Sequence, residues 1–307
     1  MQVAERVYSL SEEQDDPRQM IWACNALAGT LYFLGDFEAS GQNAMRGLQI
    51  WRSGKVQSHP EDVDTPVVGC LLYKAVTEWH HGKIASCQAT MAETISLAKE
   101  LNDTNALALA LNWAAFLAYL ERNPAEAERL ASDLMELSTR YNLAYFLTVS
   151  AIHRGWARNA FGDFAEGISG IEGGIRDLRA TGAVLGMPFF LARKAEALHL
   201  AGRTSEALEA ISEAETVAER FEQRYFCAEL QRFRGVFLAA VGSEGTQIEA
   251  SFCAAIKIAR EQKSISLEKR AEESYAEYRR QKANASGERG FRLSLCCCQK
   301  GNAQTQV

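Results

Sequence analysis

Six turn positions recur along the chain at nearly constant intervals, each between two stretches with helical periodicity. From the second to the sixth, successive positions lie 40 residues apart. The first interval is 47 residues, and its surplus falls in a proline-bearing loop at 53–66. The positions are Gly35, Gly82, Arg122, Gly162, Gly202 and Gly242. A constant period of this length is typical of stacked helical repeats.

Two columns of small residues keep the same period. Seven residues before the turns stand Ala28, Ala75, Ala115, Gly155, Ala195 and Gly235. Five residues after the turns stand Ser40, Cys87, Ala127, Gly167 and Ala207, and an extra residue in the last repeat puts Ile248 there instead. Short side chains on both sides of a turn predict two helices that cross closely.

The turn sequences fit helical hairpins. The triplet Gly-Asp-Phe stands at 35–37 and again at 162–164. Its glycine can end the first helix in the left-handed conformation, and its aspartate can cap the second helix. The second helices are amphipathic, as in 204–221, where apolar residues recur every three or four positions. A single hairpin cannot bury such a face alone, so the hairpins must stack.

These patterns predict an all-α fold, a right-handed solenoid of about six helical hairpins with repeats of about 40 residues. We expect the pairs from about residue 17 to 262, one helix before them at 2–10, and a terminal capping helix at 266–283. The repeat domain then spans 1–283. The Ser-, Gly- and Gln-rich segment 284–307 is predicted to be a disordered tail.

Composition narrows the function classes. The net charge is −6 and no Lys/Arg-rich stripe is visible, which argues against a nucleic-acid partner. The longest apolar stretch, 106–120, is too short to span a bilayer, so no membrane association is expected. None of the eight cysteines forms a C-x-x-C pair, which favours the reducing cytoplasm. The run Cys296–Cys298 lies in the predicted tail, and its role stays open.

The paired helices with their small and turn residues resemble tetratricopeptide repeats, in a longer version than the usual unit of about 34 residues. Several segments also resemble the C-terminal repeat region of large bacterial signalling proteins, namely "LAGTLYFLGDFEAS", "NWAAFLAYLERNPAEAERLASDL", "RGWARNAFGDFAEGI", "KAEALHLAGRTSEALEAI" and "RGFRL". In that family an AAA-type ATP-binding regulatory module, often behind a nucleotide-cyclase domain, precedes the repeats. The resemblance implies that this chain is the C-terminal part of a longer protein. It also implies that any ATPase or cyclase activity resides in domains upstream of it.

Motifs for chemistry are missing from the sequence. There is no phosphate-binding G-x-x-x-x-G-K-[ST] loop, no H-E-x-x-H, no G-x-S-x-G and no zinc-type Cys/His spacing. His80 and His81 are adjacent and cannot share a helix face, while His153 and His199 come from different repeats. We therefore expect no enzymatic activity, no catalytic or metal-binding residue and no cofactor.

A binding role fits the pattern better. By analogy with tetratricopeptide repeats, the first helices of successive pairs line a concave face, and counting back from the turns gives its residues. They mix aromatic, amide and charged side chains, as recognition surfaces do. The large aromatics could equally pack between helices. The candidates are Asn25, Tyr32, Trp79, Asn112, Tyr119, Trp156, Asn159, Glu196, His199 and Arg232. Asn112 lies in an apolar helix, so its amide needs a partner or an open groove.

The leading hypothesis is an interaction and sensing module that binds a protein or peptide partner. The upstream domains of the same polypeptide could be that partner, and a small-molecule effector is a further option. Occupancy would regulate an ATPase or cyclase. Two alternatives stay open, a structural spacer or oligomerisation arm, and a part of a protein whose overall activity is that of an adenylate or guanylate cyclase.

Overall fold

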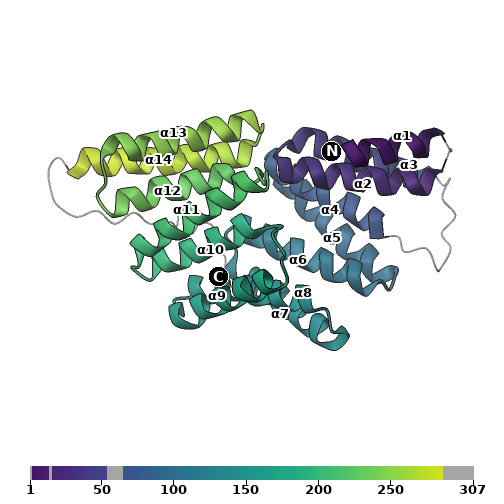
Figure 1. Cartoon of the computed structure of the whole chain (residues 1–307), viewed down its shortest axis with the longest axis horizontal. Coiled ribbons are helices and arrows are strands. Elements are labelled where there is room, and N and C mark those ends of the chain that lie inside the picture. Colours follow the sequence, from purple (N-terminus) through teal and green to yellow (C-terminus); the bar gives the residue numbers. More distant parts are fainter. Residues whose placement is uncertain (1, 14–15, 54–64, 286–307) are drawn as a thin grey trace, which may run out of the picture.

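The computed structural model describes residues 2–13, 16–53 and 65–285 (Figure 1). Within them it contains fourteen helices and no strand. The helices are α1 Gln2–Glu13, α2 Pro17–Leu34, α3 Phe37–Arg52, α4 Thr65–His80, α5 Ile84–Glu100, α6 Thr104–Leu120, α7 Pro124–Tyr141, α8 Ala144–Ala160, α9 Phe164–Ala180, α10 Met187–Leu200, α11 Thr204–Arg220, α12 Cys227–Ala240, α13 Gly245–Glu261 and α14 Ile265–Ala285. Each helix packs on its successor, which confirms the all-α solenoid.

The predicted hairpins are the six pairs α2–α3, α4–α5, α6–α7, α8–α9, α10–α11 and α12–α13. Their turns work as the sequence indicated. Gly35 and Gly162 have φ values of 85° and 94°, in the left-handed region. Asp36 accepts a hydrogen bond from the amide of Ala39 at 3.0 Å and so caps α3. Among the six turn positions, the exception in residue type is Arg122, which takes φ 58°.

The small-residue columns mark close helix crossings, as predicted. A Cβ atom placed on Gly167 of α9 would lie 2.8 Å from the carbonyl oxygen of Gly155 in α8. In the first pair the Ser40 hydroxyl donates to the carbonyl of Ala28 at 2.8 Å, which joins the two columns directly. In the sixth pair, where Ile248 breaks the column, the ring of Phe252 lies 3.0 Å from the Cβ position of Gly235.

The two ends of the stack meet. After the chain has passed through α4–α11, the C-terminal helices lie next to the N-terminal ones (Figure 1), and α14 contacts α4. The Ser266 hydroxyl of α14 donates to the carbonyl of Trp79 at 2.5 Å. The backbone amide of Arg224 donates to the carbonyl of Phe33 in α2 at 2.7 Å. The first helices of the pairs therefore enclose a largely filled centre rather than an open concave face.

Two further predictions concern the C-terminal end of the chain, where the described residues stop at 285. The capping helix, predicted at 266–283, is α14 and extends to Ala285. The rest of the predicted tail, including Cys296–Cys298, lies outside the described ranges, so its disorder and the domain boundary at 283 stay predictions. In the described part of the chain, no helix combines the length and apolar character needed to cross a membrane.

Candidate functional site

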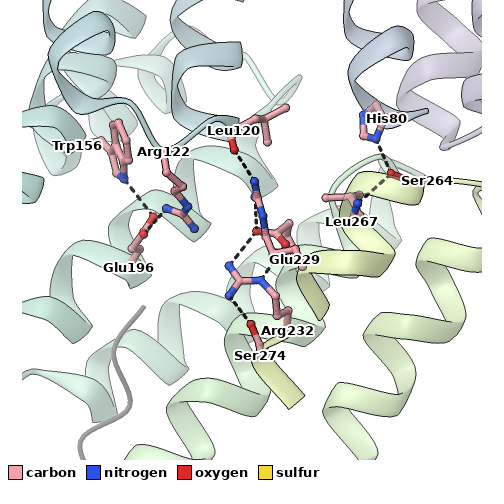
Figure 2. A network of polar contacts seen from close by, with 11 residues as sticks. His80, Leu120, Arg122, Trp156, Glu196, Glu229, Arg232, Ser264, Leu267 and Ser274 are labelled. Atoms are coloured by element: carbon pink, nitrogen blue, oxygen red, sulfur yellow. Dashed lines mark hydrogen bonds and ion pairs between the residues drawn. The ribbon is translucent and has the colours of Figure 1, made fainter. Parts of the chain in front are cut away.

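The centre of the molecule holds a network of buried ions (Figure 2). Glu229 of α12 is 1% exposed and accepts two hydrogen bonds from Arg232, at 2.8 and 2.9 Å. Arg270 of α14 also donates to Glu229, at 3.2 Å, and to the backbone carbonyl of Leu120 at the end of α6. Burial alone would raise the pKa of Glu229, but Arg232 and Arg270 hold it well below its usual range. This ionised cluster joins the last helices to the middle of the stack.

A second ion pair lies beside it (Figure 2). Glu196 of α10 is 3% exposed, pairs with Arg122 and accepts a hydrogen bond from the indole nitrogen of Trp156 at 3.1 Å. The Arg122 guanidinium also lies 5.0 Å from the ring centre of Tyr119. Removing one partner of such a pair would leave an uncompensated buried charge. The first cluster joins α12 and α14 to α6, and the second joins the α6–α7 turn to α8 and α10, so we interpret both as contacts that fix the inner packing of the stack.

Seven of the ten residues predicted for the binding face are at most 3% exposed and contact one another or the core. They are Tyr32, Trp79, Tyr119, Trp156, Asn159, Glu196 and Arg232. In this closed arrangement they offer a ligand almost no surface. Their role in binding stays a prediction.

The other three candidates, Asn25, Asn112 and His199, are half-buried. His199 bonds Thr204 at 3.0 Å between Nδ1 and Oγ1 and packs on the ring of Phe237. The Oδ1 atom of Asn25 is buried against Gly69 without a hydrogen-bond partner. Of these three, Asn112 lines a cavity.

That cavity, of about 280 Å³, lies on the inner side of the first helices. We call it the aromatic pocket. Its walls include Trp113 and Phe116 of α6, whose ring centres are 5.3 Å apart, and Phe189 of α10, 4.8 Å from Phe116. Phe33 of α2 and Tyr225, just before α12, complete the wall with ring centres 5.1 Å apart in a T-shaped arrangement. The pocket is therefore built from both ends of the stack as well as its middle.

A chain of polar contacts leads from the pocket into the core. Arg193 of α10 is fully buried, and its Nη1 lies 2.7 Å from Nδ1 of His153. Nε2 of His153 lies 3.0 Å from Oδ1 of Asn112. The Arg193 guanidinium sits 4.1 Å from the ring centre of Phe189 and 4.5 Å from that of Tyr119. Burial, and secondarily Arg193, lower the pKa of His153 well below its usual value, so this imidazole is neutral.

A larger cavity of about 780 Å³ lies where the α2–α3 turn faces α11–α13. Its lining is acidic, with Asp36, Glu38, Glu215, Glu219, Glu222 and Glu261 against Arg224 and Lys263. Glu38 is paired with Lys263, and Glu215 with Arg234. Within the described residues, no group of three or more His, Cys, Asp or Glu side chains could hold a metal ion.

The sequence interpretation missed His153, Arg193, Trp113 and Tyr73 as a set, although all but Arg193 line the aromatic pocket. They stand 40 residues apart, nine positions before successive turn residues. The predicted binding-face residues stand at other distances from the same turn residues. A search for large side chains in every 40-residue column would have found them.

Comparison with known proteins agrees with this architecture. The family model for anaphase-promoting complex subunit 5 matches residues 67–120. An uncharacterized protein of Rhizobium meliloti (strain 1021) is 26% identical over 274 residues, which are 88% of this chain. The chain spans about a quarter of that relative's length, 26%.

One solved structure shows a similar fold. Bacillus thuringiensis PlcR, solved in complex with the peptide PapR7 and DNA, superposes with a TM-score of 0.51 at 15% identity, over 81% of this chain and 84% of PlcR. The TPR2AB domain of yeast Sti1 gives a TM-score of only 0.32 at 13% identity, over 85% of this chain and 97% of that one, which is too low to support an argument. The helical hairpins, their turns and the likeness to PlcR show that the chain has a tetratricopeptide-like helical repeat fold.

Proposed function

We propose that this chain is a non-catalytic, cytoplasmic interaction and sensing module of a larger bacterial signalling protein. It binds a peptide, a partner domain or an effector on its inner face and regulates an ATPase or cyclase domain of the same protein. No cofactor takes part in this role. The Rhizobium relative, of which this chain matches about a quarter, has the additional length that such an arrangement requires.

The observation that carries the proposal is the position of the aromatic pocket at the junction of the two ends. Phe33 and Tyr225 both line it, and the amides of Arg224 and Tyr225 donate to the carbonyl of Phe33 at 2.7 and 3.2 Å. A ligand in the pocket therefore contacts both sides of the junction. It shifts the equilibrium between closed and open stacks by its difference in affinity for the two.

The likeness to PlcR is consistent with a peptide ligand, because PlcR was solved with a peptide bound. That likeness concerns the fold, and the binding itself needs a direct test.

The test is selection of a displayed random-peptide library against the chain. Leu109→Glu places a carboxylate in the lining of the aromatic pocket and should abolish the enrichment seen with the parent. The matched control is Leu200→Glu, at a leucine that is 39% exposed and outside the pocket lining, and it should enrich the same peptides as the parent. Enrichment that survives Leu109→Glu would place binding elsewhere on the surface.

Sensing is tested separately by amide hydrogen exchange. An enriched peptide should slow exchange at the amides of Arg224 and Tyr225, because it stabilises the junction in which both amides are hydrogen-bonded to Phe33. Unchanged exchange there, with a bound peptide, would mean that binding is not sensed through the junction, whereas the absence of any enriched peptide would favour a structural spacer or oligomerisation arm.

A further inference from the structure

The hydrogen-bond chain behind the aromatic pocket fixes which polar atoms the pocket presents. A guanidinium can only donate, so Nδ1 of His153 accepts from Arg193. The neutral ring then carries its proton on Nε2 and donates it to Oδ1 of Asn112. This orientation leaves the amide NH₂ of Asn112 for the pocket that Asn112 lines, and no partner for it lies in the described part of the chain. The pocket thus presents hydrogen-bond donors at this point.

The charge buried behind the pocket is the positive guanidinium of Arg193, which also favours a ligand atom of negative charge. Arg193 is fully buried, and its Nε and Nη2 atoms have no hydrogen-bond partner. Glu196, an acid close enough to interact with it, is already paired with Arg122 and Trp156. No Asp or Glu occurs among the described residues that line the aromatic pocket. In a medium of low dielectric constant an incompletely compensated cation favours a nearby anion.

Size and wall chemistry define the rest of the ligand. A volume of about 280 Å³ lies just below the range of about 300–1,000 Å³ usual for small-molecule sites, which indicates a small ligand or one terminal group of a larger one. The walls are aromatic rings in edge-to-face arrangements, which suit one further ring or a branched apolar group.

We propose that the aromatic pocket binds a carboxylate attached to one bulky apolar group, with the carboxylate accepting from the Asn112 amide and the apolar group packed against Trp113, Phe116 and Phe189. The proposal rests on the proposed function and specifies the ligand class of the same pocket. Two sources share this chemistry, a free aromatic or branched-chain acid and the C-terminal residue of a peptide.

Isothermal titration calorimetry of the full chain tests it with matched probes. One pair is 3-phenylpropionate and its neutral amide, and the other is a short alanine peptide ending in phenylalanine, with a free or an amidated C-terminus. In at least one pair, the acid should bind about 10- to 100-fold more tightly than its amide, because this is the usual contribution of a hydrogen bond to a charged group. Binding of the free acid alone identifies a small-molecule ligand, and binding of the peptide alone identifies a peptide C-terminus.

A substitution isolates the donor. Asn112→Asp keeps an oxygen for His153 but replaces the NH₂ group by a second carboxylate oxygen, so acid binding should fall at least 10-fold. The matched control is Asn105→Asp, the same change at an exposed position of the same helix, which should bind like the parent.

Three results would overturn the proposal: no probe binds, acid and amide bind equally to the parent, or Asn112→Asp binds the acid as well as the parent does. The acid–amide comparison needs no variant, so it holds even if a substitution disturbs folding. Peptides that enrich in the library selection and depend on Leu109, without a carboxylate requirement, would leave the proposed function standing while removing this inference.

Discussion

The contact between α8 and α9 gives a sharp test of the repeat architecture through Gly167→Ala. In an exposed helix this change would stabilise the protein by about 1 kcal/mol, because alanine loses less backbone entropy than glycine. Here the added Cβ would lie 2.8 Å from Cβ of Asn159, 2.8 Å from the carbonyl oxygen of Gly155 and 2.9 Å from the amide nitrogen of Asn159. Two of these three atoms belong to the backbone of α8, so rotation of a side chain cannot relieve the clash.

The magnitude follows from the balance of these two effects. Overpacking typically costs about 1–3 kcal/mol, and contact between two helix backbones puts this site near the upper end. After the gain in helix propensity of about 1 kcal/mol, we expect Gly167→Ala to lower the free energy of unfolding by about 1–2 kcal/mol.

Gly173→Ala is the matched control in the same helix. A Cβ there would meet only the Nη2 atom of Arg176, at 3.6 Å, so the substitution should stabilise by about 0.5–1 kcal/mol. Guanidinium denaturation followed by circular dichroism measures both variants against the parent. The reasoning fails if Gly167→Ala proves as stable as Gly173→Ala, since the helices would then not be in backbone contact.

Two further predictions concern the central contacts. Arg122→Gly relieves a left-handed conformation, which is worth about 1 kcal/mol, but it leaves buried Glu196 without its partner. We therefore expect the free energy of unfolding, measured with denaturant, to fall by about 2–4 kcal/mol. Asn102→Gly, at φ 52°, is the control and should not destabilise the protein. His80 is buried against the stacked ring of Phe37, and burial lowers its pKa well below 6.5. As the pH falls below about 6.5, His80 therefore takes up a proton in the unfolded chain before it does so in the folded protein. Because of this residue, the free energy of unfolding should decrease between pH 6.5 and 5 by up to about 1.4 kcal/mol per pH unit. His80→Gln should show a shallower dependence on pH, and an unchanged slope would mean that His80 takes up a proton while the protein is folded.

The helical pairs could be predicted from the sequence because their determinants are local. A left-handed glycine such as Gly162 and a capping residue such as Asp163 act within one turn of chain. The close crossing of Gly155 and Gly167 links positions only twelve apart, within one hairpin. Glycine recurs at five of the six turn positions and small residues recur in both columns, so the repeats reinforce one interpretation.

The closed centre could not be predicted in the same way. Closure depends on a small rotation that accumulates from pair to pair, and no single residue specifies it. Trp79 and Arg232 were assigned to the inner side of their helices, but α14 approaches both, through Ser266 and Ser274. The aromatic pocket was anticipated only through Asn112, whose need for a partner inside an apolar helix is met by His153.

Two turn residues with long side chains at positive φ reach distant repeats. Within the described pairs, Arg122 is the turn position that carries a side chain at positive φ, and its guanidinium reaches Glu196 of α10. Lys263, also at positive φ, follows α13 and pairs with Glu38 of α3, at the other end of the stack. A left-handed residue with a long side chain costs about 1 kcal/mol that glycine would not. The Arg122–Glu196 contact joins the third pair to the fifth, in the middle of the stack. The Lys263–Glu38 contact forms only while the ends of the stack remain together, so this turn favours the closed arrangement over the open one.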